Sequence, residues 1–418
     1  MSEESVATHQ HPVGEPETTF PLEPPLTAGD PRAEGESDQR ALSVGYDYDA
    51  VDPALFDRPI GTGIDRWAPL LPPLAGPGLD AGGTPLVEVP EVGSWAGLDG
   101  TLYVKDESRN PTWSHKDRLN RVVTSAAVRA DADGIVVAST GNHGASAAAH
   151  AARAGLDRVV FTVPGTPPAM EAFVRSYDAA VFQVGEHDQL VRFVDALAER
   201  GFHPATSRTR VHTGHPYGPE GYKTIAYETV GQLGGVPAAV AAPTAFAELL
   251  YGVWKGFREL AALGVVETTP QMIACEPATQ AALSAARERE QPLVEIDAGP
   301  SEAHSIGGSR STHRGYLTLE ESDGLAVPVP EATTTEAQER LGESGFWQEF
   351  SAAAGVAGLR ELGATFDGPV VALACSSGYK DGVDWSAPTL APDAVVADVV
   401  DRAEAEYGVS IGSSSADR

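Results

Sequence analysis

The sequence predicts an α/β protein in which parallel-type β-sheets are covered by helices on both faces. Three observations indicate this class. Short runs of Val, Ala and Ile alternate with amphipathic stretches from about residue 85 onward. The apolar runs are nearly continuous, which is typical of strands that are buried on both faces of a sheet. With 418 residues and 42% hydrophobic content, the chain is long enough for two domains and can form a substantial core.

The expected elements follow from the apolar runs and from the turn residues between them. The run GIVVAS (134–139) predicts a buried strand, and the Ala-rich stretch after it predicts a helix that ends at Gly155. Further strands are expected at 158–163, 180–185, 238–243, 271–277 and in PVVALACSSG (369–378). Further helices are expected at 169–179, 188–201, 221–234 and 247–264. Because ligands of such sheets bind beyond the carboxyl ends of the strands, motifs at those ends are candidate site residues.

The charge balance excludes two classes of partner. With 59 acidic and 29 basic residues, the chain carries a formal charge of -30. Such a surface repels the phosphates of nucleic acids and the anionic headgroups of membranes. No apolar run approaches the roughly 20 residues of a membrane span. We therefore expect neither a nucleic-acid nor a membrane partner, and we attribute the acidity to solubility.

The cysteines and the N-terminus predict a cytoplasmic location. Cys275 and Cys375 match no zinc or redox spacing, so free thiols in a reducing compartment are expected. The first residues are acidic and lack the apolar segment of a secretory signal. Residues 1–45 are rich in Pro, Gly, Glu and Ser without apolar periodicity, which predicts a disordered acidic tail. Folding of this tail on a partner is the alternative.

Lysine is scarce in this chain, and one lysine stands in an unusual context. Five of the 29 basic residues are lysines and the others are arginines. Lys116 lies in the stretch NPTWSHKDR (110–118), directly after a turn signal. An exposed basic position in such a chain would ordinarily be Arg, so we infer a need for an amine that can lose its proton. The alternative is a surface lysine at the start of a helix.

Two polar motifs follow expected strands. In ASTGNHGAS (138–146), a loop of small residues can direct backbone N–H groups at a carboxylate or phosphate. The alternative is an ordinary turn with Asn142 as helix N-cap. In CSSGYKD (375–381), a serine hydroxyl can face a buried ring nitrogen, and the alternative is a simple turn. His212 and His215 have no carboxylate or cysteine at a useful spacing, so no metal site is predicted.

Taken in their order along the chain, these motifs resemble those of threonine synthase and, more broadly, of the fold-type II pyridoxal-phosphate enzymes. The resemblance covers roughly residues 80–385. The stretches that carry it are GGTPLVEVP (82–90), LYVKDESRNPTWSHKDR (102–118), ASTGNHGAS (138–146), EGYKTIAYETVGQLGG (220–235), LLYGVWKGFREL (249–260), GFWQEFSAAAGVAGL (345–359) and SSGYKD (376–381).

The resemblance implies a pyridoxal 5'-phosphate cofactor and a role for each motif. Lys116 would form the Schiff base with the cofactor, which requires an amine that can deprotonate. Asn142 would contact the 3′-oxygen of the cofactor ring, and Ser376 or its neighbour Ser377 would face the pyridine nitrogen. The residues expected to hold the substrate carboxylate are Ser139, Thr140, Gly141, Asn142 and His143.

The resemblance also implies a two-domain architecture with the cofactor cleft between the domains. We expect a larger cofactor-binding domain formed by residues 46–120 and 206–395. A smaller α/β domain is expected at residues 121–205. Residues 396–418 would form a C-terminal helix and tail, and the protein would be a homodimer.

The chain departs from the family pattern at the expected phosphate site. Where the family has a run of glycines, this chain has Ala245, Phe246, Ala247 and Glu248. Side chains there resist the positive φ angles that such loops often need. We expect the Thr244 hydroxyl and the N–H groups at the start of the next helix to hold the phosphate weakly, with Glu248 pointing away. Three smaller departures are Trp113 for Gly, His115 for Phe and Cys375 for Thr.

The implied function is that of a lyase or synthase in amino-acid metabolism. The enzyme would take a small amino-acid substrate, remove its Cα proton with Lys116 and expel a β- or γ-leaving group, as threonine synthase-like enzymes do. Within this class, β-replacement and threonine or serine dehydration are the alternatives. Outside it, the alternative is a non-catalytic relative that kept the fold and only binds a ligand, which the lost glycines favour.

Overall fold

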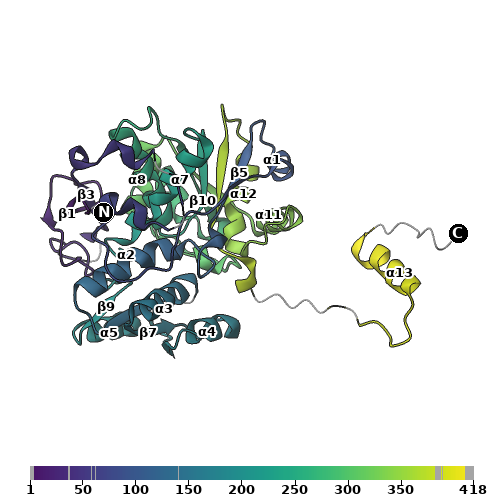
Figure 1. The fold of residues 1–418 in the computed structure, drawn as a ribbon, viewed down its shortest axis with the longest axis horizontal. Coiled ribbons are helices and arrows are strands. Elements are labelled where there is room, and N and C mark those ends of the chain that lie inside the picture. Colours follow the sequence, from purple (N-terminus) through teal and green to yellow (C-terminus); the bar gives the residue numbers. More distant parts are fainter. Residues whose placement is uncertain are drawn as a thin grey trace. The chain divides into compact units, whose positions relative to one another are not determined.

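The computed structural model describes residues 4–35, 38–57, 59–61, 63–139, 141–381, 387 and 389–409. The chain divides into two compact units, Met1–Asp381 and Gly382–Arg418. The second unit holds α13 (Val396–Tyr407), a helix without buried residues in the predicted C-terminal segment. The other named helices and strands belong to the first unit (Figure 1).

The larger sheet of the first unit has five parallel strands and one antiparallel strand at its edge. Its spatial order is β12 (Leu325–Val329), β11 (Gln271–Pro277), β10 (Ala239–Pro243), β13 (Val370–Ala374), β5 (Leu102–Asp106) and β4 (Leu86–Glu88). In the register, Ala239 of β10 is paired with Gln271 on one side and with Val370 on the other. Strands distant in sequence thus lie side by side, as the crossovers of a parallel sheet require.

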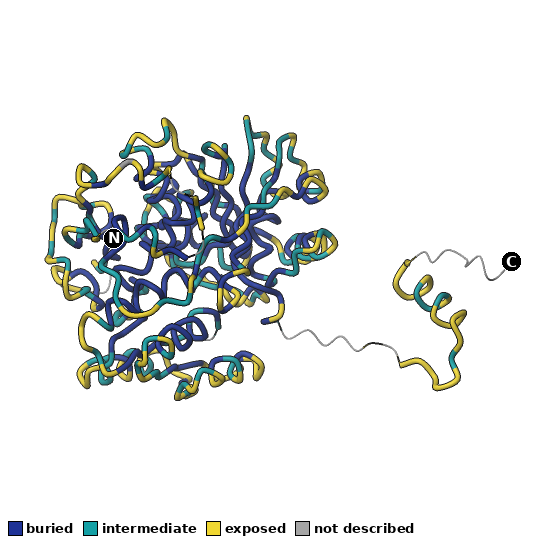
Figure 2. The backbone as a smooth tube through the Cα atoms, viewed as in Figure 1, coloured by how far each residue is buried: buried dark blue, intermediate teal, exposed yellow. Residues whose placement is uncertain are grey.

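Helices cover both faces of this sheet. Ala239 and Ala241 of β10 belong to the core on the face covered by α12 (Phe350–Leu362), α11 (Glu331–Glu343) and α1 (Pro90–Ala96). Val240 and Ala242 point to the opposite face and pack in the core that includes α8 (Glu248–Ala262). Because successive side chains of a strand point to opposite faces, this strand must be apolar at every position. Figure 2 shows the central strands buried.

A second sheet contains only parallel strands. Its order is β8 (Ala180–Gln183), β7 (Asp157–Thr162), β6 (Gly134–Ala138) and β9 (Phe202–Pro204). The connecting helices are α3 (Asn142–Ala154), α4 (Pro168–Arg175) and α5 (His187–Ala198). Val136 of β6 packs with Val194 of α5, while Ile135 and Val137 share the core that contains the alanines of α3.

Helix α2 (Lys116–Arg129) follows β5 of the larger sheet and precedes β6 of the second sheet along the chain. It packs against α3 (Figure 1) and against α6 (Gly218–Tyr222). A Cβ at Gly221 would lie 2.1 Å from the carbonyl oxygen of Arg118, so this close approach of α6 to α2 requires glycine. The remaining α-helices are α7 (Thr224–Leu233), α9 (Ala282–Glu288) and α10 (His313–Glu321). Among the described residues, the named 3-10 helices are η2 (Tyr48–Ala50), η3 (Pro53–Leu55), η4 (Asp65–Leu70), η5 (Glu107–Arg109), η6 (Ala278–Gln280), η7 (His304–Ile306) and η8 (Gly378–Lys380).

The predicted α/β class with helix-flanked, parallel-type sheets is confirmed. The strand expected at 134–139 is β6, and the helix expected at 247–264 is α8. The division into a domain of residues 121–205 and one formed by 46–120 and 206–395 stays a prediction.

The N-terminal segment is folded, so the prediction of a disordered tail over residues 1–45 is wrong for the residues that the structure describes. The segment forms an antiparallel sheet of β2 (Phe20–Pro21), β1 (Ala7–Pro12) and β3 (Leu42–Tyr46). The fully buried Gln10 amide donates to three backbone carbonyls, those of Pro21, Leu22 and Pro24, and accepts from the N–H of Leu26. The Gln10 side chain therefore supplies hydrogen bonds to backbone groups of this segment, whose sequence shows no apolar periodicity.

Buried polar contacts join this segment to the rest of the first unit. Lys255 of α8 donates to the carbonyl oxygen of Val44 at 2.6 Å and to the hydroxyl of Ser43 at 3.0 Å. The same amine pairs with Glu220 at 2.6 Å, and Glu220 also accepts from the Tyr46 hydroxyl at 2.9 Å. The segment is therefore part of the folded unit.

Replacing Gln10 by leucine should lower the free energy of unfolding by about 2 kcal/mol, because several buried backbone groups lose their partner at once. Chemical denaturation monitored by circular dichroism measures this change. Gln183→Leu is the matched control, since the amide of Gln183 donates to Glu171 at an exposed position; it should change stability by less than about 0.5 kcal/mol. Equal effects of the two substitutions would contradict the packing described for the N-terminal segment.

The two cysteines are buried free thiols, as expected from their spacing. Burial raises the pKa of both thiols. Within the described residues, no helix is both long enough and apolar enough to cross a membrane.

Candidate active site

A cavity of about 670 Å³ opens where three parallel strands end. Its wall includes Ser139 after β6, Thr244 after β10 and Ser376 after β13. These strands belong to both parallel-type sheets, and their carboxyl ends face the same space, as expected for ligand sites in α/β proteins. The volume is that of a pocket for a small-molecule ligand.

Lys116 lines this cavity as the first residue of α2. The turn before it bends at Trp113, which adopts a φ of 61° that glycine accommodates more readily. His115 then fastens the turn to the end of β13, because its backbone N–H donates to the Cys375 carbonyl at 2.9 Å. The ring nitrogen Nδ1 of His115 lies 3.1 Å from the same oxygen. The start of α2 is thus fixed against the strand that carries the serine motif.

Asp117 connects the start of α2 to α3. Its buried carboxylate accepts from the Thr112 hydroxyl at 2.7 Å and from the Ser146 hydroxyl at 2.6 Å, and lies 3.5 Å from His150 Nε2. Burial alone would raise the pKa of Asp117, but the contacts with His150, Ser146 and Thr112 outweigh it and hold the pKa below its usual value. Asp117, the neighbour of Lys116, is therefore ionised and holds the start of α2 against α3.

Lys116 differs from the other lysines in the partners of its amine. The other four donate to protein oxygens: Lys105 to Glu228, Lys223 to Glu220 and Glu259, Lys255 to Glu220, and Lys380 to Asn142. Among the described residues, the Lys116 amine has no hydrogen bond or ion pair, and it lies 5.6 Å from the centroid of the Tyr222 ring. Burial lowers the pKa of Lys116, although the charge of Glu248 opposes this shift. The amine is thus open to the cavity and loses its proton more readily than that of a solvent-exposed lysine.

Asn142, at the start of α3, joins the two polar motifs. Its Oδ1 accepts from the Ser376 hydroxyl at 3.0 Å and from the Lys380 amine. Its Nδ2 donates to Glu349 Oε2 at 2.7 Å, and Glu349 also accepts from the Ser305 hydroxyl. Burial lowers the pKa of Lys380 to about 8. The Ser376 hydroxyl and the Asn142 amide thus lie at the same end of the cavity, where they can contact the heteroatoms of a flat polar ring.

The loop expected to hold the substrate carboxylate also lies at the cavity. Ser139, Gly141 and His143 line it, while Thr140 falls outside the described residues. The Gly141 N–H donates to the Ser139 hydroxyl at 3.3 Å. His143 Nε2 lies 2.9 Å from the Ala205 carbonyl, and burial lowers its pKa to about 4, so the ring is neutral near pH 7.

The loop before α8 differs from the expectation in one respect. Ala247 adopts a φ of 58°, so the left-handed backbone of a glycine loop is present without the glycine. The Thr244 hydroxyl donates to the Ala242 carbonyl at 2.8 Å and lines the cavity. Glu248 was expected to point away, but it lines the cavity, because Arg314 at 3.1 Å and His212 at 3.5 Å hold its carboxylate there. That expectation is wrong.

Charged partners set the ionisation of Glu248. Burial alone would raise its pKa, but His212, Arg314 and Lys116 outweigh burial and hold the pKa well below the usual range. The loop therefore presents a carboxylate to the cavity near neutral pH.

The two serines of the SSG motif have different surroundings. Ser376 lines the cavity, and its hydroxyl also contacts the carbonyl oxygen of Trp113 at 3.2 Å. The Ser377 hydroxyl instead accepts from the N–H of Tyr379 at the start of η8, and Ser377 is not among the described residues that line the cavity. Of the two candidates, Ser376 is the one positioned at the cavity.

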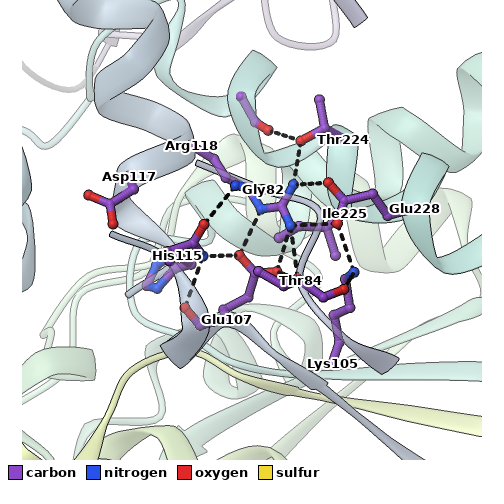
Figure 3. A network of polar contacts seen from close by, with 12 residues as sticks. Gly82, Thr84, Lys105, Glu107, His115, Asp117, Arg118, Thr224, Ile225 and Glu228 are labelled. Atoms are coloured by element: carbon purple, nitrogen blue, oxygen red, sulfur yellow. Dashed lines mark hydrogen bonds and ion pairs between the residues drawn. The ribbon is translucent and has the colours of Figure 1, made fainter. Parts of the chain in front are cut away.

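A buried ion network supports the helix that carries Lys116 (Figure 3). Arg118 Nε donates to Glu107 at 2.7 Å, and its Nη1 donates to Glu228 at 2.6 Å. Lys105 pairs with the other oxygen of Glu228 at 2.7 Å, and Thr84 donates to Glu107 at 2.6 Å. The network joins α2 to β5, η5 and α7, so the start of α2 is fixed from this side as well as from β13.

Sequence reasoning missed three charged residues near this cavity: Glu349, Lys380 and Arg314. Glu349 and Lys380 meet at Asn142, although they are separated from it by 207 and 238 residues. The only local signal was a charged side chain within a stretch of small or apolar residues, as in QEFSAAAG (348–355). The pair His212 and His215 does not form one site, because His215 Nε2 contacts His203 Nε2 at 2.9 Å while His212 faces Glu248.

Comparison with known proteins identifies the family. The family model described as "Pyridoxal-phosphate dependent enzyme" matches residues 78–376. The threonine synthase of Synechocystis sp. is 34% identical over 310 residues, which cover 72% of this chain and 77% of the relative. The threonine synthase of Methanosarcina acetivorans is 29% identical over 331 residues, which cover 77% and 80%.

Solved structures share the fold at lower identity. Maize serine racemase superposes with a TM-score of 0.61 at 16% identity, covering 71% of this chain and 88% of that chain. The T.th. threonine deaminase superposes with a TM-score of 0.60 at 22% identity, covering 73% and 94%. The resemblance to fold-type II pyridoxal-phosphate enzymes is thereby confirmed. The chain belongs to the pyridoxal-phosphate dependent enzyme family and is an enzyme of its threonine synthase-like branch, with pyridoxal phosphate as cofactor.

Proposed function

We propose that this enzyme is a lyase that removes a β- or γ-leaving group from an amino acid, in the manner of a threonine synthase. One observation carries the proposal most directly. Of five lysines, Lys116 alone has an amine without a polar partner among the described residues, and it lines the cavity together with Asn142 and Ser376. A reactive amine needs this combination of access and a lowered pKa.

The residues at the cavity fit the cofactor that the family uses. When bound, pyridoxal phosphate supplies an electron sink that stabilises negative charge at the substrate Cα. Lys116 would bind its aldehyde, Asn142 would contact the ring oxygen, and Ser376 would donate to or accept from the ring nitrogen. Ser377 is a weaker candidate for that last role, since its hydroxyl caps η8. Thr244 stands at the strand end where the cofactor phosphate is expected.

Each side chain then has a defined task in the reaction. Lys116, as a neutral amine, takes the Cα proton and can return it as an ammonium. The backbone N–H groups and side chains of residues 139–143, Thr140 included, hold the substrate carboxylate at the start of α3. His143 stays neutral and keeps this loop in place through Asn120, whose Nδ2 lies 3.2 Å from its Nδ1.

The proposal includes two expectations about the protein in the cell. A homodimer and a cytoplasmic location are both expected for a threonine synthase-like enzyme with free buried thiols. Light scattering coupled to size-exclusion chromatography measures the first, and fractionation of the native cell measures the second.

The reaction is tested by supplying the cofactor-loaded protein with homoserine esters, including the phosphate ester, and with serine and threonine. Mass spectrometry and an ammonia assay identify the products. Threonine formed from a homoserine ester supports the proposed γ-elimination with water addition. Ammonia and a 2-oxo acid formed from serine or threonine would instead identify a dehydratase, and no turnover of any compound would contradict the proposal.

A further inference from the structure

The side-chain amide of Asn142 lies between a lysine and a carboxylate. Its Oδ1 accepts from the Lys380 amine, and its Nδ2 donates to Glu349 Oε2 at 2.7 Å. An ammonium group can only donate hydrogen bonds, and a carboxylate can only accept them. If the amide were turned over, its oxygen would face the carboxylate and its nitrogen would face the ammonium. Only one orientation of the amide therefore satisfies both neighbours.

Glu349 is fixed in its place as the acceptor. Its backbone N–H donates to the Ser376 carbonyl at 2.9 Å, which ties it to the segment after β13. Its Oε1 accepts from the Ser305 hydroxyl while Oε2 accepts from Asn142, so both oxygens act as acceptors. The side chain lines the cavity and belongs to a buried residue. The wall of the cavity thus contains a permanent acceptor for the Asn142 nitrogen.

Lys380 supplies the opposite group from outside the cavity. It lies in η8, is 8% exposed and is not among the described residues that line the cavity. Its Nζ lies 5.8 Å from the centroid of the Phe173 ring on α4, a distance at which an aromatic face attracts a cation. The next residue, Asp381, accepts from the N–H of Phe350 at 2.7 Å, which fastens this segment to the start of α12. Burial of an ammonium group costs free energy, so a lysine at this position needs a reason.

The orientation of the amide decides what Asn142 offers to a ligand. An amide nitrogen carries two N–H groups, and the only hydrogen bond of Nδ2 to another described residue is the one to Glu349. Oδ1 is already occupied, because Lys380 and the Ser376 hydroxyl at 3.0 Å both donate to it. Since Asn142 lines the cavity, it presents a second N–H and not an oxygen to a bound molecule. A donor attracts an electron-rich oxygen, whereas an amide oxygen would repel it.

We propose that Lys380 is a positioning residue, which holds the Asn142 amide so that its N–H meets the ring 3′-oxygen of the cofactor. This inference rests on the proposed function, in which Asn142 contacts that oxygen while Lys116 binds the aldehyde. Lys380 acts through Asn142 and does not touch the cofactor. The positive charge of its amine also balances the negative charge of Glu349 on the other side of the amide.

The test compares pyridoxal phosphate with 3-deoxypyridoxal phosphate, which lacks the ring oxygen but keeps the aldehyde and the phosphate. Affinity for each is measured at pH 7 by titrating the absorbance of the adduct at Lys116 in the full-length protein. Lys380→Met should weaken pyridoxal phosphate binding about 5- to 10-fold and change binding of the analogue by less than about twofold. In an Asn142→Ala background, the same substitution should change neither affinity by more than about twofold, because no amide is left to orient.

The matched control is Lys255→Met, which also removes a lysine that is 8% exposed. Lys255 donates to Glu220 and to the Val44 carbonyl, and it does not belong to the described lining of the cavity. Its replacement should lower stability and leave the ratio of the two affinities unchanged. The control therefore separates the loss of a buried charge from the loss of an oriented donor.

A second variant, Lys380→Gln, keeps the test decisive if Lys380→Met does not fold. The glutamine amide can accept as well as donate, so it does not enforce the orientation, and the ratio should change about three- to fivefold. An equal loss of affinity for both aldehydes, or a ratio unchanged within about twofold, would overturn the inference. If the wild-type protein forms no adduct with pyridoxal phosphate, the proposed function itself fails, and that result is seen before any variant is compared.

Discussion

Replacing Lys116 by alanine should lower kcat by a factor of at least about 1,000, because both the cofactor anchor and the general base are lost. No other lysine can take over, since the other four amines are already bonded to protein oxygens. Lys116→Arg should be equally inactive, because a guanidinium does not deprotonate in this pH range. Steady-state kinetics with the substrate identified in the product assay measure the effect.

The control for this substitution must keep the fold while changing a charge elsewhere. Arg153, whose Nε contacts the Gly78 carbonyl at an exposed position, can be changed to alanine for this purpose. Its kcat should stay within a factor of about two of the wild-type value. Retention of about a tenth or more of wild-type kcat in Lys116→Ala would mean that another group performs the proton transfer.

Replacing Arg118 by methionine should lower the free energy of unfolding by about 3–5 kcal/mol, because Glu107 and Glu228 would remain as buried and unbalanced charges. Both carboxylates and the guanidinium have no exposed surface. Burial alone would raise the pKa of Glu228, but Arg118 and Lys105 outweigh it and hold the pKa well below the usual value. Urea unfolding followed by fluorescence measures the loss.

The matched control is Arg340→Met, which breaks an exposed ion pair with Glu343 on the surface of α11. Such pairs contribute little, so stability should change by less than about 0.5 kcal/mol. A loss below about 1 kcal/mol for Arg118→Met would show that the network is not needed for stability. Since α2 begins at Lys116, cofactor affinity should fall together with stability in the Arg118 variant.

Much of the fold could be predicted because central strands such as β10 and β13 are apolar at every position. Both faces of β10 are covered, so its sequence is AVAAP without alternation, and the same holds for β13. Flanking glycines such as Gly155 and Gly234 then marked the helix ends.

The N-terminal segment was missed because polar hydrogen bonds, some within the segment and others to residues far along the chain, help to order it. Gln10 and Ser43 stabilise the segment through single amide and hydroxyl groups, and neither leaves a periodic signal in the sequence. Composition alone therefore predicted disorder for residues 1–45.

The candidate site could be predicted in part for a similar reason. Lys116, Asn142 and Ser376 stand in compact local motifs at the ends of strands or the starts of helices. Glu349 reaches the cavity, and Arg314 its surroundings, only through tertiary packing. The one local signal, a charged Glu349 within QEFSAAAG (348–355), does not by itself separate a buried charge from a surface charge. Glu248 was assigned the wrong direction because His212 and Arg314, which hold it at the cavity, were not yet placed beside it.

The central claim is that Lys116 is the amine that carries the cofactor. Borohydride reduction of the protein loaded with pyridoxal phosphate, followed by proteolysis and mass spectrometry, tests it directly. The account predicts a single pyridoxyl group, on the peptide that contains Lys116, and unmodified Lys105, Lys223, Lys255 and Lys380. A pyridoxyl group on any of those four, or none on Lys116 at saturating cofactor, would contradict it.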